Sequence, residues 1–172
     1  YNESFAGDAG LDKFKTDLGA FIKHTLGQNY SGKASARVVL FAPIAAEASS
    51  DANRSPAAPL NANLKKYAAA MAEVAKANDV PFVDLFGISA DVFDRAAKQK
   101  QPLTTWWKPW TWRVFDRAAK QKQSLTFNAV HLTEAGDKAL APEAFRALFG
   151  ETAPGGNMEK LRSAVLDKNL EW

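Results

Sequence analysis

The sequence has no cysteine, only two histidines and no long run of apolar residues. Without cysteine, disulfides, thiolate catalysis and cysteine-ligated zinc are excluded. No apolar stretch reaches the length of a membrane-spanning helix, so we expect no membrane span. The net charge of +3 is small, the lysines are scattered and no nucleic-acid-binding motif is present, so we expect no nucleic-acid partner. No clustered His/Asp/Glu spacing could supply three ligands, so we predict no metal site and no cofactor.

The chain has the size and composition of one soluble globular domain. Its 172 residues are enough for a sizeable core, and 47% hydrophobic with 24% charged residues is ordinary for such a domain. Apolar residues recur at helical spacing over residues 11–26 and again from Leu64 to Val74. A continuous apolar, β-branched run at residues 37–42 is typical of a buried parallel strand, and residues 80–86 are predicted as the next strand. Helix, strand, helix, strand in this order predicts an α/β fold with a parallel sheet.

A polar loop, residues 44–60, follows the first predicted strand. Open α/β sheets place their sites beyond the carboxyl ends of their strands, so this loop is expected near a site.

Residues 92–104 and 114–126 are the same sequence except that Pro102 is replaced by Ser124. We interpret residues 102–123, approximately, as a local duplication or insertion. Four tryptophans lie between the copies, and Trp106 and Trp110 are candidates for stacking a sugar or another flat ligand. The alternative is that the tryptophans only cover the duplicated helix.

One histidine, His131, stands on a predicted loop immediately before a helix. Thr133 is a suitable N-cap, and Glu134 and Asp137 fall where a helix N-terminus favours negative charge. A histidine in such a loop can carry protons near neutral pH. The alternative is a polar loop residue without a chemical role. The following helix is predicted to be interrupted or restarted at Pro142.

Four segments carry a resemblance to a known family. They are residues 2–7 (NESFAG), 41–44 (FAPI), 83–86 (VDLF) and 128–133 (NAVHLT). In this order the chain resembles the SGNH (GDSL-type) hydrolases, and more narrowly the SGNH modules of large exported proteins of planctomycete-type bacteria. The resemblance implies a three-layer α/β/α, flavodoxin-like fold over residues 1–150. Residues 151–172 are then a linker and a C-terminal helix. The resemblance also implies that the chain is part of an exported, multidomain protein.

The resemblance implies a role for three residues. His131 matches the general base, Asn128 stands where the family has an aspartate that supports this base, and Asn2 matches the oxyanion-hole asparagine. The nucleophilic serine block of the family, Gly-Asp-Ser, is not in the chain, which opens at Tyr1. We therefore expect an N-terminally incomplete domain with no esterase activity of its own. An amide at position 128 can accept a hydrogen bond from the imidazole but cannot stabilise an imidazolium by charge.

Two functions follow from these patterns. The first is a serine esterase domain that hydrolyses O-acyl esters, with carbohydrate esters as the substrate class. The second is a non-catalytic SGNH-like module that binds polysaccharide or a partner domain, which Asn128 and the tryptophans favour.

Overall fold

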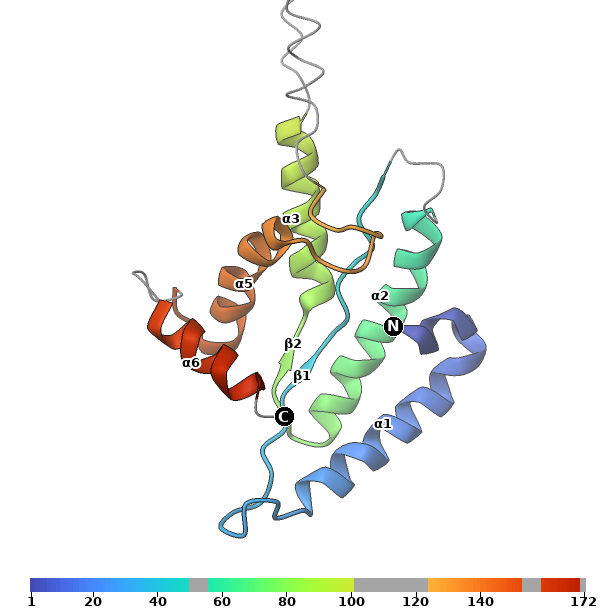
Figure 1. The fold of residues 1–172 in the computed structure, drawn as a ribbon. Coiled ribbons are helices and arrows are strands. Elements are labelled where there is room, and N and C mark those ends of the chain that lie inside the picture. The colour runs from blue at the N-terminus through green and yellow to red at the C-terminus, as the bar shows by residue number, and fades with distance from the viewer. Residues whose placement is uncertain (50–55, 101–123, 153–158, 171–172) are drawn as a thin grey trace, which may run out of the picture.

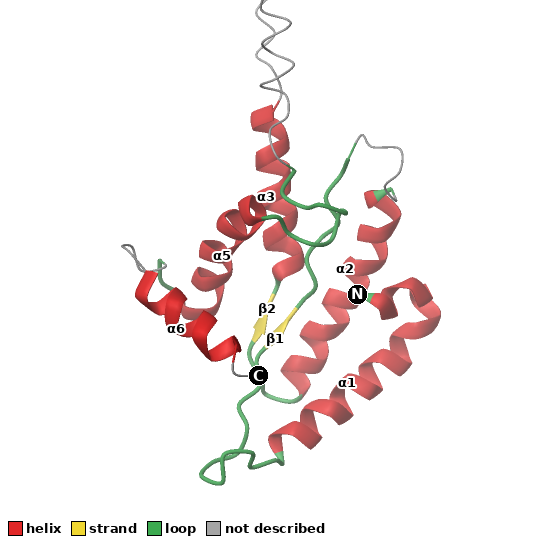
Figure 2. Ribbon diagram, in the orientation of Figure 1, coloured by secondary structure: helices red, strands yellow, loops and turns green. Residues whose placement is uncertain are grey.

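A computed structural model describes residues 1–49, 56–100, 124–152 and 159–170. Most of them are helical (Figure 2). The elements in chain order are the 3-10 helix η1 (Asn2–Gly10), α1 (Leu11–Leu26), β1 (Leu40–Phe41), α2 (Ala57–Ala77), β2 (Phe82–Val83), α3 (Leu85–Lys100), α5 (Glu134–Phe149) and α6 (Glu159–Leu170).

The two strands pair in parallel, as the order of helices and strands predicts. Leu40 lies opposite Phe82, and Phe41 lies opposite Val83. The chain is thus of mixed α/β type. Both strands are shorter than predicted, since only two residues of each predicted run are paired. The second run ends early because the carboxylate of Asp84 accepts a hydrogen bond from the N–H of Gly87 at 3.0 Å, which starts α3 at Leu85.

Apolar side chains form two clusters, one on each side of the strand pair. The first joins α1 and α2 to the strands through Ile22, Leu40, Val74, Ala75 and Val80. The second joins α3, α5 and the loops beyond the strands through Ala45, Val92, Phe93, Leu125 and Leu140. In Figure 1 the strand pair lies between these two groups of helices.

The two predicted N-terminal helices are confirmed. α1 ends at Leu26, and Gly27 is its C-cap residue. On α2 the predicted apolar face is the buried face, with Leu64, Tyr67 and Val74 buried and Met71 packed against the first cluster. The second histidine, His24, lies exposed on α1.

The predicted interruption at Pro142 is wrong. α5 runs unbroken from Glu134 to Phe149 with Pro142 inside it, and ends at Gly150, whose φ of 71° is left-handed. A proline removes one backbone donor from a helix. Here a capped N-terminus, a left-handed C-cap and the packing of α5 against α3 hold the helix together on both sides of that position.

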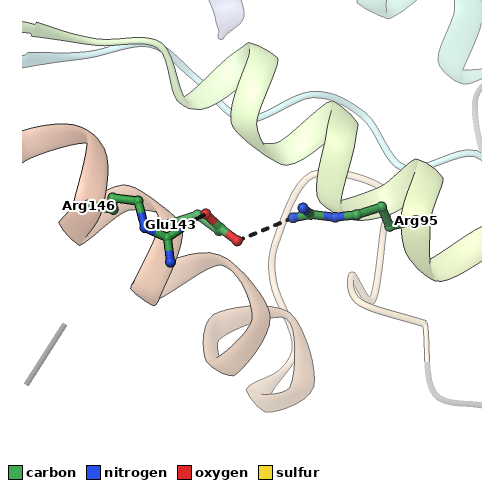
Figure 3. A network of polar contacts seen from close by, with 3 residues as sticks. All are labelled: Arg95, Glu143 and Arg146. Atoms are coloured by element: carbon green, nitrogen blue, oxygen red, sulfur yellow. Dashed lines mark hydrogen bonds and ion pairs between the residues drawn. The ribbon is translucent and has the colours of Figure 1, made fainter. Parts of the chain in front are cut away.

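An ionic contact joins α3 to α5 at the surface (Figure 3). Glu143 lies between Arg95 of α3, at 3.4 Å, and Arg146 one turn further along α5, at 2.7 Å. Both arginines are more than half exposed, so solvent screens this network and its contribution to stability is small.

None of the described helices is both long and apolar enough to cross a bilayer.

Candidate active site

Residues 124–133, called the His loop here, fold back on themselves as a small hairpin. The N–H of Phe127 donates to the carbonyl of His131 at 3.0 Å, and the N–H of Thr133 donates to the carbonyl of Leu125 at 2.8 Å. Thr126 and Leu132 form the antiparallel bridge between these two bonds. The hairpin therefore presents residues 127–131 at its tip.

The base of the His loop is fixed to the start of α5. Thr133 is the N-cap, as predicted, and its hydroxyl accepts a hydrogen bond from the N–H of Gly136. The same hydroxyl lies 3.0 Å from the carbonyl of Ser124. A Cβ atom added at Gly136 would lie 2.0 Å from the carbonyl oxygen of Leu125. Only glycine allows the loop to approach the helix so closely.

Asn128 and His131 are in direct contact at the tip. Oδ1 of Asn128 lies 2.9 Å from Nδ1 of His131 and accepts the N–H of His131, also at 2.9 Å. It is also 3.4 Å from the N–H of Val130. Asn128 is thus both a turn residue and the hydrogen-bond partner of the imidazole. Both side chains are exposed.

This geometry favours one of the two tautomers of the neutral His131 imidazole. The two backbone N–H groups require an acceptor, so they orient the Asn128 amide with its oxygen toward them and toward Nδ1. A carboxamide oxygen only accepts, so the contact requires a proton on Nδ1 of His131. The neutral imidazole then has its lone pair on Nε2, the arrangement that a general base needs.

In a serine protease triad, asparagine in place of the aspartate lowers the rate by about 10⁴, through the wrong tautomer of the histidine. In this chain two backbone N–H groups orient the amide so that its oxygen, and not its N–H₂ group, faces Nδ1 of His131. An amide oxygen carries no negative charge, unlike a carboxylate oxygen.

Ala129 follows Asn128 in a conformation that is uncommon for a residue with a side chain. Its φ is 76°, and its side chain is buried. Its carbonyl accepts a hydrogen bond from the N–H of Glu47 at 2.8 Å. Such a backbone costs roughly 1–3 kcal/mol and persists only where surrounding contacts impose it. At Ala129 these contacts are the burial of its side chain and the hydrogen bond from Glu47, and both act on the turn that brings Asn128 against His131.

Phe127 stacks on His131 at the tip. The ring centroids are 5.4 Å apart and the planes are 18° from parallel. Phe127 is 62% exposed, so the stacked pair forms a flat aromatic surface open to solvent.

Sequence reasoning missed the carboxylate that contacts the His loop. Glu47, in the loop after β1, is only 7% exposed. Its carboxylate accepts hydrogen bonds from the hydroxyl of Ser124 (2.6 Å), the N–H of Leu125 (3.1 Å) and both the N–H and hydroxyl of Thr126 (2.7 and 2.6 Å). Burial by itself raises the pKa of Glu47, but these hydrogen bonds outweigh it and hold the pKa below its usual value.

One sequence signal could have found Glu47. It is the acidic residue nearest to the end of β1, in the loop that the strand order places at the site. What the sequence does not contain is the distance in space to residues 124–126, which lie 77 to 79 positions later.

Asn2 is not in contact with the pair. It is exposed in the first turn of η1, which packs against α1 and α2. Within the described part of the chain, no hydrogen bond or ring contact joins Asn2 to Asn128 or His131. Its oxyanion role stays a prediction. Trp106 and Trp110 lie outside the described residues, as does the predicted insertion at 102–123.

Ser4 and Ser31 make local contacts to the backbone. The hydroxyl of Ser4 donates to the carbonyl of Tyr1 at 2.6 Å. Ser31 accepts from the N–H groups of Lys33 and Ala34, as a turn residue does. Neither contacts His131.

Among the residues that the structure describes, no group of three His, Asp or Glu side chains could hold a metal ion. No protein-family model matches the chain, and neither a curated protein nor a solved structure matches it.

Proposed function

We propose that the chain provides the histidine part of an SGNH-type serine esterase site that hydrolyses O-acyl esters of carbohydrates. The observation that carries the proposal is the 2.9 Å contact between Nδ1 of His131 and Oδ1 of Asn128, which in the neutral imidazole favours the proton on Nδ1 and the lone pair on Nε2. The three-layer α/β/α architecture and Asn2 as an oxyanion donor are parts of the same proposal.

In the proposed reaction, Nε2 of His131 takes the proton of a serine hydroxyl as that oxygen attacks the ester carbonyl. The histidine then returns the proton to the leaving alcohol, and the sequence repeats with water on the acyl-enzyme. The imidazolium forms next to a neutral amide, so it lacks the charge stabilisation that a carboxylate gives. The serine would come from a Gly-Asp-Ser block, which residues 1–172 do not contain.

The test compares the complete gene product with residues 1–172, using p-nitrophenyl acetate as the substrate. We expect turnover by the complete product, its loss in His131→Ala, and no turnover by the 172-residue chain. Phe21→Ala, an exposed aromatic on α1, is the matched control and should keep full activity. Turnover that persists in His131→Ala would contradict the proposal. So would turnover by residues 1–172 alone, since it would require a nucleophile within them.

A second candidate function is polysaccharide binding without turnover. The exposed stack of Phe127 on His131 favours it, because a sugar ring packs well on such a surface. Saturable binding that is lost in Phe127→Ala, or in Trp106→Ala with Trp110→Ala, together with no hydrolysis, would support this function over the first.

A further inference from the structure

Asn128 and His131 are exposed, so burial of their own side chains does not hold them in place. The hairpin bonds of the His loop fix its shape, and Thr133 fixes its base to α5. A further contact is needed to place the tip relative to the strands.

Glu47 provides this contact on both sides of Asn128. Its carboxylate accepts four hydrogen bonds from residues 124–126, before Asn128. Its own N–H donates to the carbonyl of Ala129, directly after Asn128. Glu47 is thus hydrogen-bonded to the chain on both sides of the turn that orients the Asn128 amide.

The loop that carries Glu47 is in turn anchored to two helices. The hydroxyl of Ser89, in α3, accepts the N–H of Ala45 at 2.8 Å. The amide of Asn61, in α2, pairs with both the N–H and the carbonyl of Ala46, at 2.7 and 2.9 Å. Glu47 therefore connects a loop anchored on α2 and α3 to the His loop. In Figure 1 the chain beyond β1 passes beside the His loop.

The chemistry of the contact requires a carboxylate. Oε2 accepts from the hydroxyl of Ser124 and from both donors of Thr126, and Oε1 accepts from Leu125. An ionised carboxyl group offers acceptor sites on both oxygens. A glutamine of the same shape would direct an N–H₂ group toward one of these sets of donors.

We propose that Glu47 is the positioning residue of this site, which holds the His loop so that Asn128 keeps the proton of His131 on Nδ1. The inference rests on the proposed function only for its effect on catalysis, because the position of the proton is measurable without any turnover. Its chemical consequence is a neutral histidine with its lone pair on Nε2.

The test is the tautomer of His131 by long-range ¹H–¹⁵N NMR on the 172-residue chain. Only two histidines contribute signals, and exposed His24 is the internal reference for an unconstrained imidazole. We expect the Nδ1–H form for His131 in the wild type and a shift toward the His24 pattern in Glu47→Gln. Glu143→Gln, the same substitution on α5, should leave the His131 signals unchanged.

A folded Glu47→Gln chain with the wild-type tautomer would overturn the proposal. If Glu47→Gln does not fold by circular dichroism, Ser124→Ala removes one of the four donors and is judged by the same criterion. In a complete esterase, we expect Glu47→Gln to lower kcat about tenfold to a hundredfold with little change in KM. If the tautomers of the wild type and of Glu47→Gln are as expected but the complete gene product does not hydrolyse esters, the proposed function is refuted and the role of Glu47 stands.

Discussion

Oε2 of Glu47 accepts hydrogen bonds from both the N–H and the hydroxyl of Thr126, two fully buried donors of one residue. This joins the loop after β1 to the loop that carries His131, across 79 positions of sequence. Because of these bonds, the conformation of the candidate site depends on whether the Glu47 carboxylate is ionised or protonated.

The lowered pKa of Glu47 predicts a pH dependence of stability. Its pKa is lower in the folded chain than in the unfolded chain, so the folded state binds the proton less well. The stabilisation is therefore fully present above the ordinary carboxylate pKa and is lost as the pH falls through the lowered pKa of the folded state. We expect urea unfolding, measured from neutral to acid pH, to show a smaller loss of stability for Glu47→Gln than for the wild type. Parallel pH profiles for the two proteins would contradict this.

Glu47→Gln should also be less stable at neutral pH. One set of buried donors loses its acceptor, which costs about 1–3 kcal/mol. The free energy of unfolding in urea measures this cost. Glu143→Gln, whose partners are exposed arginines, is expected to cost less than about 1 kcal/mol. Equal costs for the two substitutions would argue against a special role for the buried carboxylate.

Replacing Gly136 by alanine should destabilise the chain. The new methyl group would meet a backbone carbonyl, that of Leu125, which is held in place by the N–H of Thr133. Overpacking of this kind costs about 1–3 kcal/mol or more. Gly19→Ala is the matched control, since its Cβ would have no neighbour closer than 3.9 Å and it lies inside α1. We expect that change to stabilise the helix by about 0.5–1 kcal/mol. Thermal unfolding followed by circular dichroism compares the two.

Removal of the N-cap hydroxyl tests the link between α5 and the His loop. Thr133→Ala loses the acceptor for the N–H of Gly136 and the contact with the carbonyl of Ser124, and we expect a loss of about 1 kcal/mol. Thr133→Ser keeps the hydroxyl and should retain most of this stability. The free energy of unfolding in urea, measured for both variants, distinguishes the two groups of Thr133. If the serine variant is as unstable as the alanine variant, the lost stability comes from the methyl group and not from the hydroxyl.

The contact between Asn128 and His131 leads to a prediction about rate. Asn128→Asp keeps an acceptor opposite Nδ1 and adds the charge that stabilises the imidazolium. A charge-assisted hydrogen bond gains about 1 kcal/mol over a neutral one, equivalent to about five- to tenfold in kcat of the complete esterase. Asn128→Ala should lower kcat instead, because the preference for the proton on Nδ1 is lost. A faster Asn128→Ala enzyme would show that the amide does not support the base.

The sequence by itself determined the elements whose signals are local. The helix at Leu11–Leu26, the apolar face of α2, the parallel strand pair and the N-cap Thr133 follow from apolar periodicity, strand order and capping chemistry. The start of α2 at Ala57, inside the loop predicted over residues 44–60, does not. The sequence also placed Asn128 three positions before His131, within reach of one turn, whereas the contacts that Glu47 makes on both sides of Asn128 come from a distant loop.

Only the tertiary structure decided the rest. The length of the second strand depended on Asp84, whose carboxylate starts α3, and the continuity of α5 through Pro142 depended on caps and packing at both ends. The role of Glu47 was decided in the same way. Its hydrogen bonds join segments far apart in the chain, and no local pattern encodes a contact that forms only when two loops meet at one end of a pair of strands.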